Sequence, residues 1–123
     1  MFNFQQLDAS NSFQEQLQET TGPIVLINTF VLDTEGTVEQ VMAAWKTDAG
    51  FMKAQPGFIS AQLHRGTGSS RLVTNVSVWE STAALRNAVS SPEFREKAQA
   101  YPPGVKVYPQ ILQKVAIDGV CVG

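Results

Sequence analysis

The chain has 123 residues and a formal net charge of −2 at pH 7; 43% of its residues are hydrophobic and 16% are charged. Such a chain is expected to form one globular domain that buries about two-thirds of its unfolded surface, which excludes a disordered or membrane-spanning protein. The small negative charge gives no electrostatic reason to bind nucleic acid or an anionic membrane. The N-terminus lacks the basic region and apolar core of a secretory signal, so a cytoplasmic location is expected.

A polar arm, residues 1–22, precedes the predicted domain, which spans residues 23–118. The run from Leu7 to Ser10 can cap a short helix that continues through Phe13 and Leu17 and ends near Gly22-Pro23. We expect this arm to pack on the outside of the domain or on a partner subunit.

A nearly continuous run of β-branched and apolar residues, from Ile24 to Leu32, predicts a strand that is covered on both faces. The residues Asp33-Thr34-Glu35-Gly36 predict a turn, and Thr37 then caps a helix that ends at Gln55-Pro56-Gly57. The apolar residues of this helix recur at helical spacing: Val38, Val41, Met42, Trp45 and Met52.

Two alternating segments, Phe58 to Arg65 and Arg71 to Trp79, predict a hairpin whose loop is residues 66–70. A second helix is expected to begin at Ser81 and to restart at Ser91, because Pro92 suits a first helical position.

The segment from Val105 to Ile117 predicts a last strand, bent or delayed at Pro109, which cannot donate a ladder hydrogen bond. The tail, residues 119–123, contains the lone cysteine, Cys121. We interpret Cys121 as a spare thiol rather than a nucleophile.

The order β-α-β-β-α-β predicts an α+β fold, a ferredoxin-like unit with a four-stranded antiparallel sheet. Two helices cover only one face of such a sheet, yet the predicted strands carry apolar residues on both faces. The simplest cover for the second face is the same face of another copy, packed sheet to sheet. The sequence therefore predicts a homodimer.

Asn75 and Trp79 lie four residues apart on the third predicted strand, so their side chains project to the same side, with Ser77 between them. An amide, a hydroxyl and an indole on one surface suit a flat aromatic ligand with polar substituents. The alternative is that Trp79 is an ordinary core residue and that Asn75 is a buried polar group bonded to the backbone.

The hairpin register extends this surface to the neighbouring strand. If residues 66 and 71 pair, then Phe58 lies opposite Trp79, and Gln62 and His64 join the same face. His64 is a candidate general base because its ordinary pKa suits proton abstraction at neutral pH. A histidine beside a turn is more often a surface or interface residue.

Three motifs in order, Pro56-Gly57-Phe58, Asn75-x-x-x-Trp79 and Ser91-Pro92-Glu93-Phe94, give the chain a family resemblance. Over about residues 23 to 117 the sequence resembles the antibiotic biosynthesis monooxygenase family of the dimeric α+β barrel superfamily. The resemblance implies a cofactor-independent monooxygenase that acts with dioxygen on a phenolic, quinol or anthrone-like aromatic.

In the quinone-forming members, an Asn-x-x-x-Trp pair on this strand lines the cavity, which implies a catalytic role for Asn75 and Trp79. Neutral donors of this kind stabilise an oxyanion, while the site orients the ring and excludes water. A tyrosine and an arginine of those members fall here on Leu85 and near Gln99, so the resemblance assigns no proton acceptor. The candidate substrate-binding residues are Asn28, Trp45, Phe58, Gln62, His64 and Ser77.

No resident metal, haem, flavin or nicotinamide is expected. One histidine and one cysteine cannot assemble a zinc site of the common kinds or a two-histidine iron site, and no glycine-rich nucleotide motif is present. The haem-degrading branch of the family uses an asparagine that Asn28 matches, but Ala88 and Ala98 stand where its tryptophan and axial histidine would be.

Two other classes share this topology. RNA-recognition modules carry a glycine-aromatic pattern on the third strand, which this chain lacks. A non-catalytic ligand-binding or regulatory barrel would need the same dimer and cavity but no proton acceptor, so it is the alternative to an enzyme.

Overall fold

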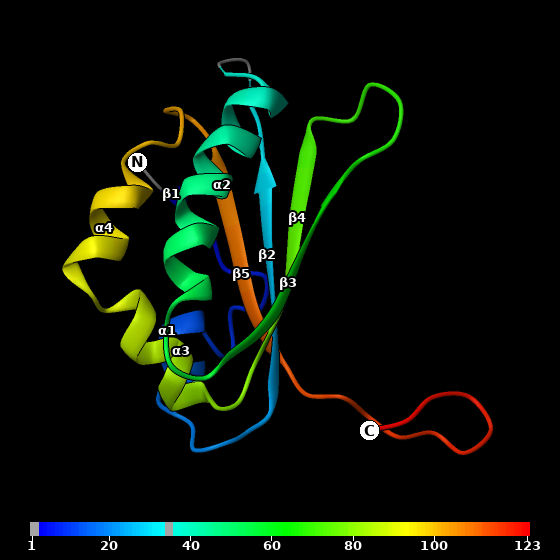
Figure 1. The fold of residues 1–123 in the computed structure, drawn as a ribbon. Coiled ribbons are helices and arrows are strands. Elements are labelled where there is room, and N and C mark those ends of the chain that lie inside the picture. The colour runs from blue at the N-terminus through cyan, green and yellow to red at the C-terminus, as the bar shows by residue number, and fades with distance from the viewer. Residues whose placement is uncertain (1–2, 34–35) are drawn as a thin grey trace.

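The computed structural model describes residues 3–33 and 36–123, so the turn expected at residues 33–36 lies partly outside the described residues. Figure 1 shows a sheet with helices packed on one side of it. The elements in chain order are β1 (Asn3–Phe4), α1 (Phe13–Gln16), β2 (Ile24–Val31), α2 (Val38–Lys53), β3 (Phe58–Arg65), β4 (Leu72–Trp79), α3 (Thr82–Val89), α4 (Pro92–Ala98) and β5 (Lys106–Leu112).

The sheet has five strands in the order β1-β5-β2-β4-β3. Its four long strands are antiparallel neighbours and have the predicted ferredoxin-like arrangement. The expectation of a four-stranded antiparallel sheet is wrong, because β1 adds a fifth strand parallel to β5, with Asn3 and Phe4 opposite Lys106 and Val107. Two residues are too few for sequence periodicity to reveal a strand.

The main helices begin where their capping residues predict. Thr37 accepts a hydrogen bond from the Gln40 backbone N–H, and the Gln40 side chain accepts one from the Thr37 backbone N–H. Ser81 and Ser91 cap α3 and α4, because their hydroxyl oxygens accept from the backbone N–H groups of Ala84 and Phe94. The predicted helix starts at these three positions are confirmed.

The N-terminal arm packs differently from the expectation. Its helix begins after Ser12 rather than within residues 7–10, because the Asp8 carboxylate accepts hydrogen bonds from the backbone and hydroxyl of Ser10 and forms a local turn there. Phe13 and Leu17 are buried in one core cluster with Trp79. The arm therefore belongs to the core of its own subunit.

The helices cover one sheet face and leave the other face bare in the single chain (Figure 1). Even-numbered residues of β2 such as Leu26 and Phe30 are buried under the helices, whereas the odd-numbered ones are only partly buried. On the bare face Ile27 and Val76 are only partly buried and Leu112 is 39% exposed. The second cover that the apolar strand pattern predicts is therefore not supplied by this chain's described residues.

The last strand continues through Pro109 and ends at Leu112, earlier than expected. The Gln16 side chain bonds both the N–H and the carbonyl of Ile111 on the outer edge of β5. In a strand, the backbone groups of residues two apart point to the same side, so an N–H at position 109 would face the same outer edge as that of Ile111. Strand β1 pairs only with Lys106 and Val107, so the missing N–H of Pro109 breaks no hydrogen bond between strands.

Beyond β5, residues 113–123 leave the body as an extended arm (Figure 1). A turn closed by hydrogen bonds between Ile117 and Cys121 gives the arm its own local structure. Its large apolar side chains are mostly exposed, Val120 to 79% and Val122 to 82%. Within residues 3–33 and 36–123, no helix has the length and apolar character needed to cross a membrane.

Candidate functional site

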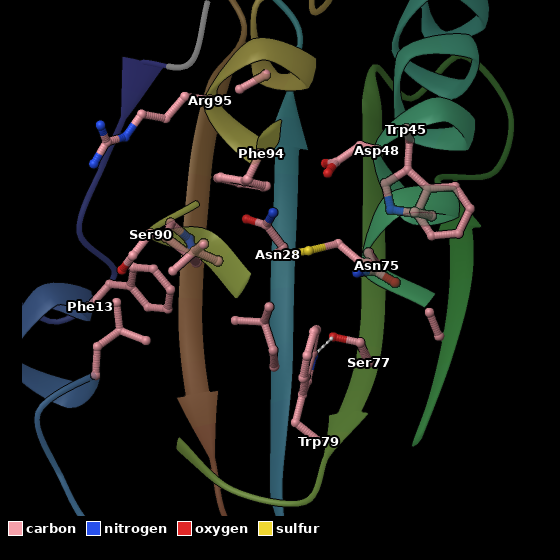
Figure 2. Close-up of a pocket in the computed structure, with 18 of the residues that line it drawn as sticks. Phe13, Asn28, Trp45, Asp48, Asn75, Ser77, Trp79, Ser90, Phe94 and Arg95 are labelled. Atoms are coloured by element: carbon pink, nitrogen blue, oxygen red, sulfur yellow. Dashed lines mark hydrogen bonds between the residues drawn. The ribbon is translucent and has the colours of Figure 1, made fainter. Parts of the chain in front are cut away.

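A cavity of about 480 Å³ lies between the helix-covered face of the sheet and the helices. Its sheet side is built from alternate residues of the two central strands, β2 and β4. Helices α2 and α4 supply Trp45, Asp48 and Phe94, and the N-terminal arm closes one end with Phe13 (Figure 2). The volume lies within the range of ordinary small-molecule sites.

Two asparagines lie side by side on the sheet surface of this cavity. Asn28 of β2 and Asn75 of β4 are direct partners in the antiparallel register. Directly opposite side chains point to the same face, and this face is the one under the helices. Both side chains line the cavity, which agrees with the predicted positions of these two residues.

Three buried oxygens at the cavity have no hydrogen-bond partner among the described residues. They are Oδ1 of Asn28, Oδ1 of Asn75 and Oδ1 of Asp48. Buried polar atoms are nearly always bonded, so three unbonded ones in one cavity need an explanation. Each of the three oxygens is an acceptor to which a hydroxyl group of a bound molecule, or a water, can donate.

Asp48 is the buried carboxylate of this site. Its side chain is only 7% exposed, and its Oδ2 accepts a 3.0 Å hydrogen bond from the Tyr101 hydroxyl. Burial raises the pKa of Asp48 to about 6, while the Tyr101 hydrogen bond and the positive charge of Lys97 act in the opposite direction. Burial and the Asp48 charge together raise the pKa of Tyr101.

The raised pKa makes stability depend on pH in a defined direction. Asp48 titrates near its ordinary pKa of 3.8 when unfolded and at about 6 when folded, so its contribution is fully present below about pH 4 and is lost as the pH rises through 6. At 1.36 kcal/mol per pKa unit, the loss is at most roughly 3 kcal/mol. Asp48→Asn should therefore be more stable than the wild type at pH 8 but not at pH 4.

Urea unfolding of both proteins at the two pH values measures this difference, with the exposed Asp33→Asn as the control. An Asp48→Asn variant that is equally destabilised at pH 4 and pH 8 would contradict the assigned titration.

Trp79 forms a wall of the cavity, but its N–H already donates a hydrogen bond within the protein. The ring is 1% exposed, and its Nε1 donates to the Ser77 hydroxyl oxygen at 3.2 Å (Figure 2). Phe58 packs edge-on against it, with ring centroids 5.4 Å apart. Since Ser77 accepts through its oxygen, its own hydroxyl proton is left to donate.

The predicted hairpin register is wrong beyond Phe58. Phe58 does pair with Trp79, but a bulge between Phe58 and Ser60 inserts one residue. A shift of one residue turns every later side chain to the other sheet face. Gln62 and His64 therefore lie opposite Val76 and Thr74 on the bare face, where both are exposed, and neither lines the cavity.

The other candidate residues do meet at the cavity, namely Asn28, Trp45, Phe58, Asn75, Ser77 and Trp79. The prediction missed Asp48 and Tyr101. Asp48 follows Trp45 by three residues and Val41 by seven, so a carboxylate on the apolar stripe of α2 was its signal. No sequence pattern indicated Tyr101, because it lies after the end of α4 and outside any helix or strand.

Two further residues, Leu85 and Gln99, stand at or near the positions where the family resemblance implies a tyrosine and an arginine in the quinone-forming members. Leu85 of α3 is fully buried and does not line the cavity, whereas Gln99 does line it. Arg95 of α4 also borders the cavity. Across residues 3–33 and 36–123, no three histidine, cysteine or acidic side chains gather in a way that could hold a metal ion.

Comparisons with known proteins agree with this architecture. A family model described as antibiotic biosynthesis monooxygenase matches residues 23–100. SnoaB, a cofactor-independent oxygenase from Streptomyces nogalater, has a similar fold with a TM-score of 0.72 at 21% identity, over 80% of this chain and 99% of that one. No curated protein sequence matches the chain.

Two other solved structures are also similar in fold. A protein of Shewanella loihica has a TM-score of 0.62 at 27% identity, and the match covers 80% of this chain and 99% of that one. A protein of Pseudomonas aeruginosa has a TM-score of 0.62 at 22% identity over the same shares of the two chains.

Proposed function

Since this chain belongs to the antibiotic biosynthesis monooxygenase family, we propose that it is a cofactor-independent monooxygenase of a phenolic, quinol or anthrone-like aromatic. The observation that carries the proposal is the paired amides of Asn28 and Asn75 in a cavity walled by aromatic rings. The rings suit a flat substrate, and the amides suit its oxygen substituents.

The chemistry requires no electron donor besides the substrate. A phenol with a free para C–H, or an anthrone, loses its proton and passes an electron to dioxygen, and the two radicals join as a ring peroxide. Loss of the ring C–H proton and cleavage of the O–O bond then leave a carbonyl and water. One oxygen atom enters the substrate and the other becomes water, so atoms and electrons balance.

The protein's part is to stabilise the oxyanion, to hold the ring and to exclude water. The Asn75 side chain presents amide N–H groups as well as its oxygen, so it can donate to an oxyanion. Trp79 acts as the wall, and its N–H orients Ser77, whose hydroxyl proton can point to the ligand. Asn28, Trp45 and Phe58 complete the binding surface.

The absence of a resident cofactor is part of the proposal. SnoaB is described as cofactor-independent, and its fold is similar to that of this chain. With dioxygen as co-substrate, the aromatic ring supplies all the electrons.

An oxygen electrode tests the proposed activity directly. The purified protein is screened with hydroquinones, naphthols and anthrones, and at least one compound should raise oxygen uptake above its own autoxidation, with a product that has gained one oxygen atom from dioxygen and with water rather than hydrogen peroxide as the second product. Compounds that bind without any oxygen uptake would instead indicate a non-catalytic ligand-binding barrel.

We also propose that the working form is a homodimer with the two bare sheet faces packed together. The support is physical, because Leu112 lies exposed on that face beside the partly buried Ile27 and Val76, and the arm of residues 113–123 presents apolar side chains to solvent. That arm is well placed to pack on the second copy.

Light scattering at micromolar concentration should give about twice the chain mass of 13.4 kDa. Deleting residues 113–123 should weaken the dimer by removing apolar contact area, so dissociation should appear at higher protein concentration. A full-length monomer that unfolds cooperatively would contradict the proposed dimer.

A further inference from the structure

We propose that Asp48 is the proton acceptor of the reaction, taking the substrate's hydroxyl proton on its Oδ1 atom. This inference rests on the function proposed above and identifies the base that it needs. Asp48 belongs to α2, outside the Asn-x-x-x-Trp strand.

The geometry of the carboxylate supports this role. Oδ2 is held by the Tyr101 hydroxyl, whereas Oδ1 is buried and has no partner among the described residues. Figure 2 shows the Asp48 carboxylate directed into the cavity from the helix side, across from the asparagine amides on the sheet. One oxygen is thus anchored and the other is available to a ligand.

The described part of the chain offers no rival base at this cavity. Among the described residues that line the cavity, Asp48 and Arg95 are the ionisable ones, and an arginine cannot accept a proton in a protein. His64, the candidate from sequence, projects from the opposite sheet face. A general base must reach the proton that it removes, and the Oδ1 atom of Asp48 lies at the cavity in which the substrate would be bound.

The surroundings of Asp48 also suit a base at neutral pH. The groups that act on it are Tyr101, which follows α4, and Lys97 of α4, with Arg95 of α4 on the same cavity; the sheet side carries the uncharged Asn28 and Asn75. Burial raises the pKa of Asp48 to about 6. Asp48 is therefore mostly ionised at pH 7 and still more basic than an ordinary aspartate.

The proposed step conserves protons. The substrate O–H bond breaks, an Oδ1–H bond forms, and the electron pair remains on the substrate oxygen. Asp48 then returns this proton to the ring peroxide that dioxygen forms. It next takes the ring C–H proton and passes it to the hydroxide released by O–O cleavage, which leaves water and an ionised Asp48.

Tyr101 is a positioning residue in this scheme. Its hydroxyl favours the ionised carboxylate and fixes its orientation. Tyr101→Phe keeps the ring, which stacks on Phe30 with centroids 5.0 Å apart, but removes the donor. The pH midpoint of kcat/KM should therefore rise in Tyr101→Phe, a change that a merely structural role would not produce.

The test uses Asp48→Asn, with Asp33→Asn as the matched control on the surface. In the wild type, kcat/KM for oxygen uptake should rise with pH through a midpoint near 6. Asp48→Asn should lose on the order of 10²–10⁴-fold and should lack this limb. Its loss should be smallest for acidic phenols that are already ionised in the buffer, since these need no base.

A hydroxyanthraquinone dye, alizarin, measures binding without turnover. Its anaerobic Kd for Asp48→Asn should stay within a few-fold of the wild-type value, which shows an intact cavity. If the wild type is active, and Asp48→Asn is equally active with an unchanged pH profile, then the role of Asp48 is overturned but the proposed function is not. A wild type without oxygen uptake on any compound would overturn the proposed function, and the inference with it.

Discussion

Replacing Asn75 with alanine is expected to lower kcat on the order of 10²-fold or more, the usual cost of one oxyanion donor. The melting temperature should change little, because the Asn75 Oδ1 atom has no partner among the described residues that the substitution would leave unbonded. The kcat and the melting temperature of Asn75→Ala together distinguish a catalytic role of the Asn75 amide from a structural role.

Steady-state oxygen uptake and thermal melts on the same preparation measure the two effects. Asn87→Ala, an exposed asparagine on α3, serves as the control for the loss of an amide. A large fall in melting temperature with unchanged turnover per folded molecule would mean that Asn75 is a structural residue of the core.

Replacing Trp79 with phenylalanine is expected to have two separable effects. Stability should fall by about 1–3 kcal/mol, because a fully buried side chain loses volume and its packing around Phe58. The rate should fall more than the affinity, because the N–H that orients the Ser77 hydroxyl is lost while most of the aromatic wall stays.

Ser77→Ala is the matched variant for this prediction. It keeps the indole wall but removes the hydroxyl between Trp79 and the ligand, so its kcat should fall in the same direction with a smaller loss of stability. If Trp79→Phe melts early while turnover per folded molecule is unchanged, then Trp79 belongs to the core and not to the catalytic site.

The local structure could be predicted because its signals are local. Thr37, Ser81 and Ser91 each accept a backbone hydrogen bond at the start of a helix, and this depends on neighbouring residues alone. The spacing of Asn75, Ser77 and Trp79 likewise fixes that the three share a strand face, whatever the rest of the fold does.

Local sequence patterns could not predict that Asp48 lies in the site. Its place on the apolar stripe of α2 predicts burial, but not what it faces. Only the packing of α2 over β2 and β4 brings it to the same cavity as Asn28 and Asn75. Tyr101, 53 positions away along the chain, then supplies its hydrogen bond.

By itself, the sequence determined the order of the longer elements, the starts of α2, α3 and α4, and the shared face of Asn75 and Trp79, because capping and side-chain alternation act over a few residues. Only the tertiary structure decided the bulge after Phe58, which moves Gln62 and His64 out of the site, the fifth strand at Asn3–Phe4, and the meeting of Asp48 with the two asparagines in one cavity. These three features depend on contacts between residues far apart in the chain, and such contacts cannot be predicted from a pattern of neighbouring residues.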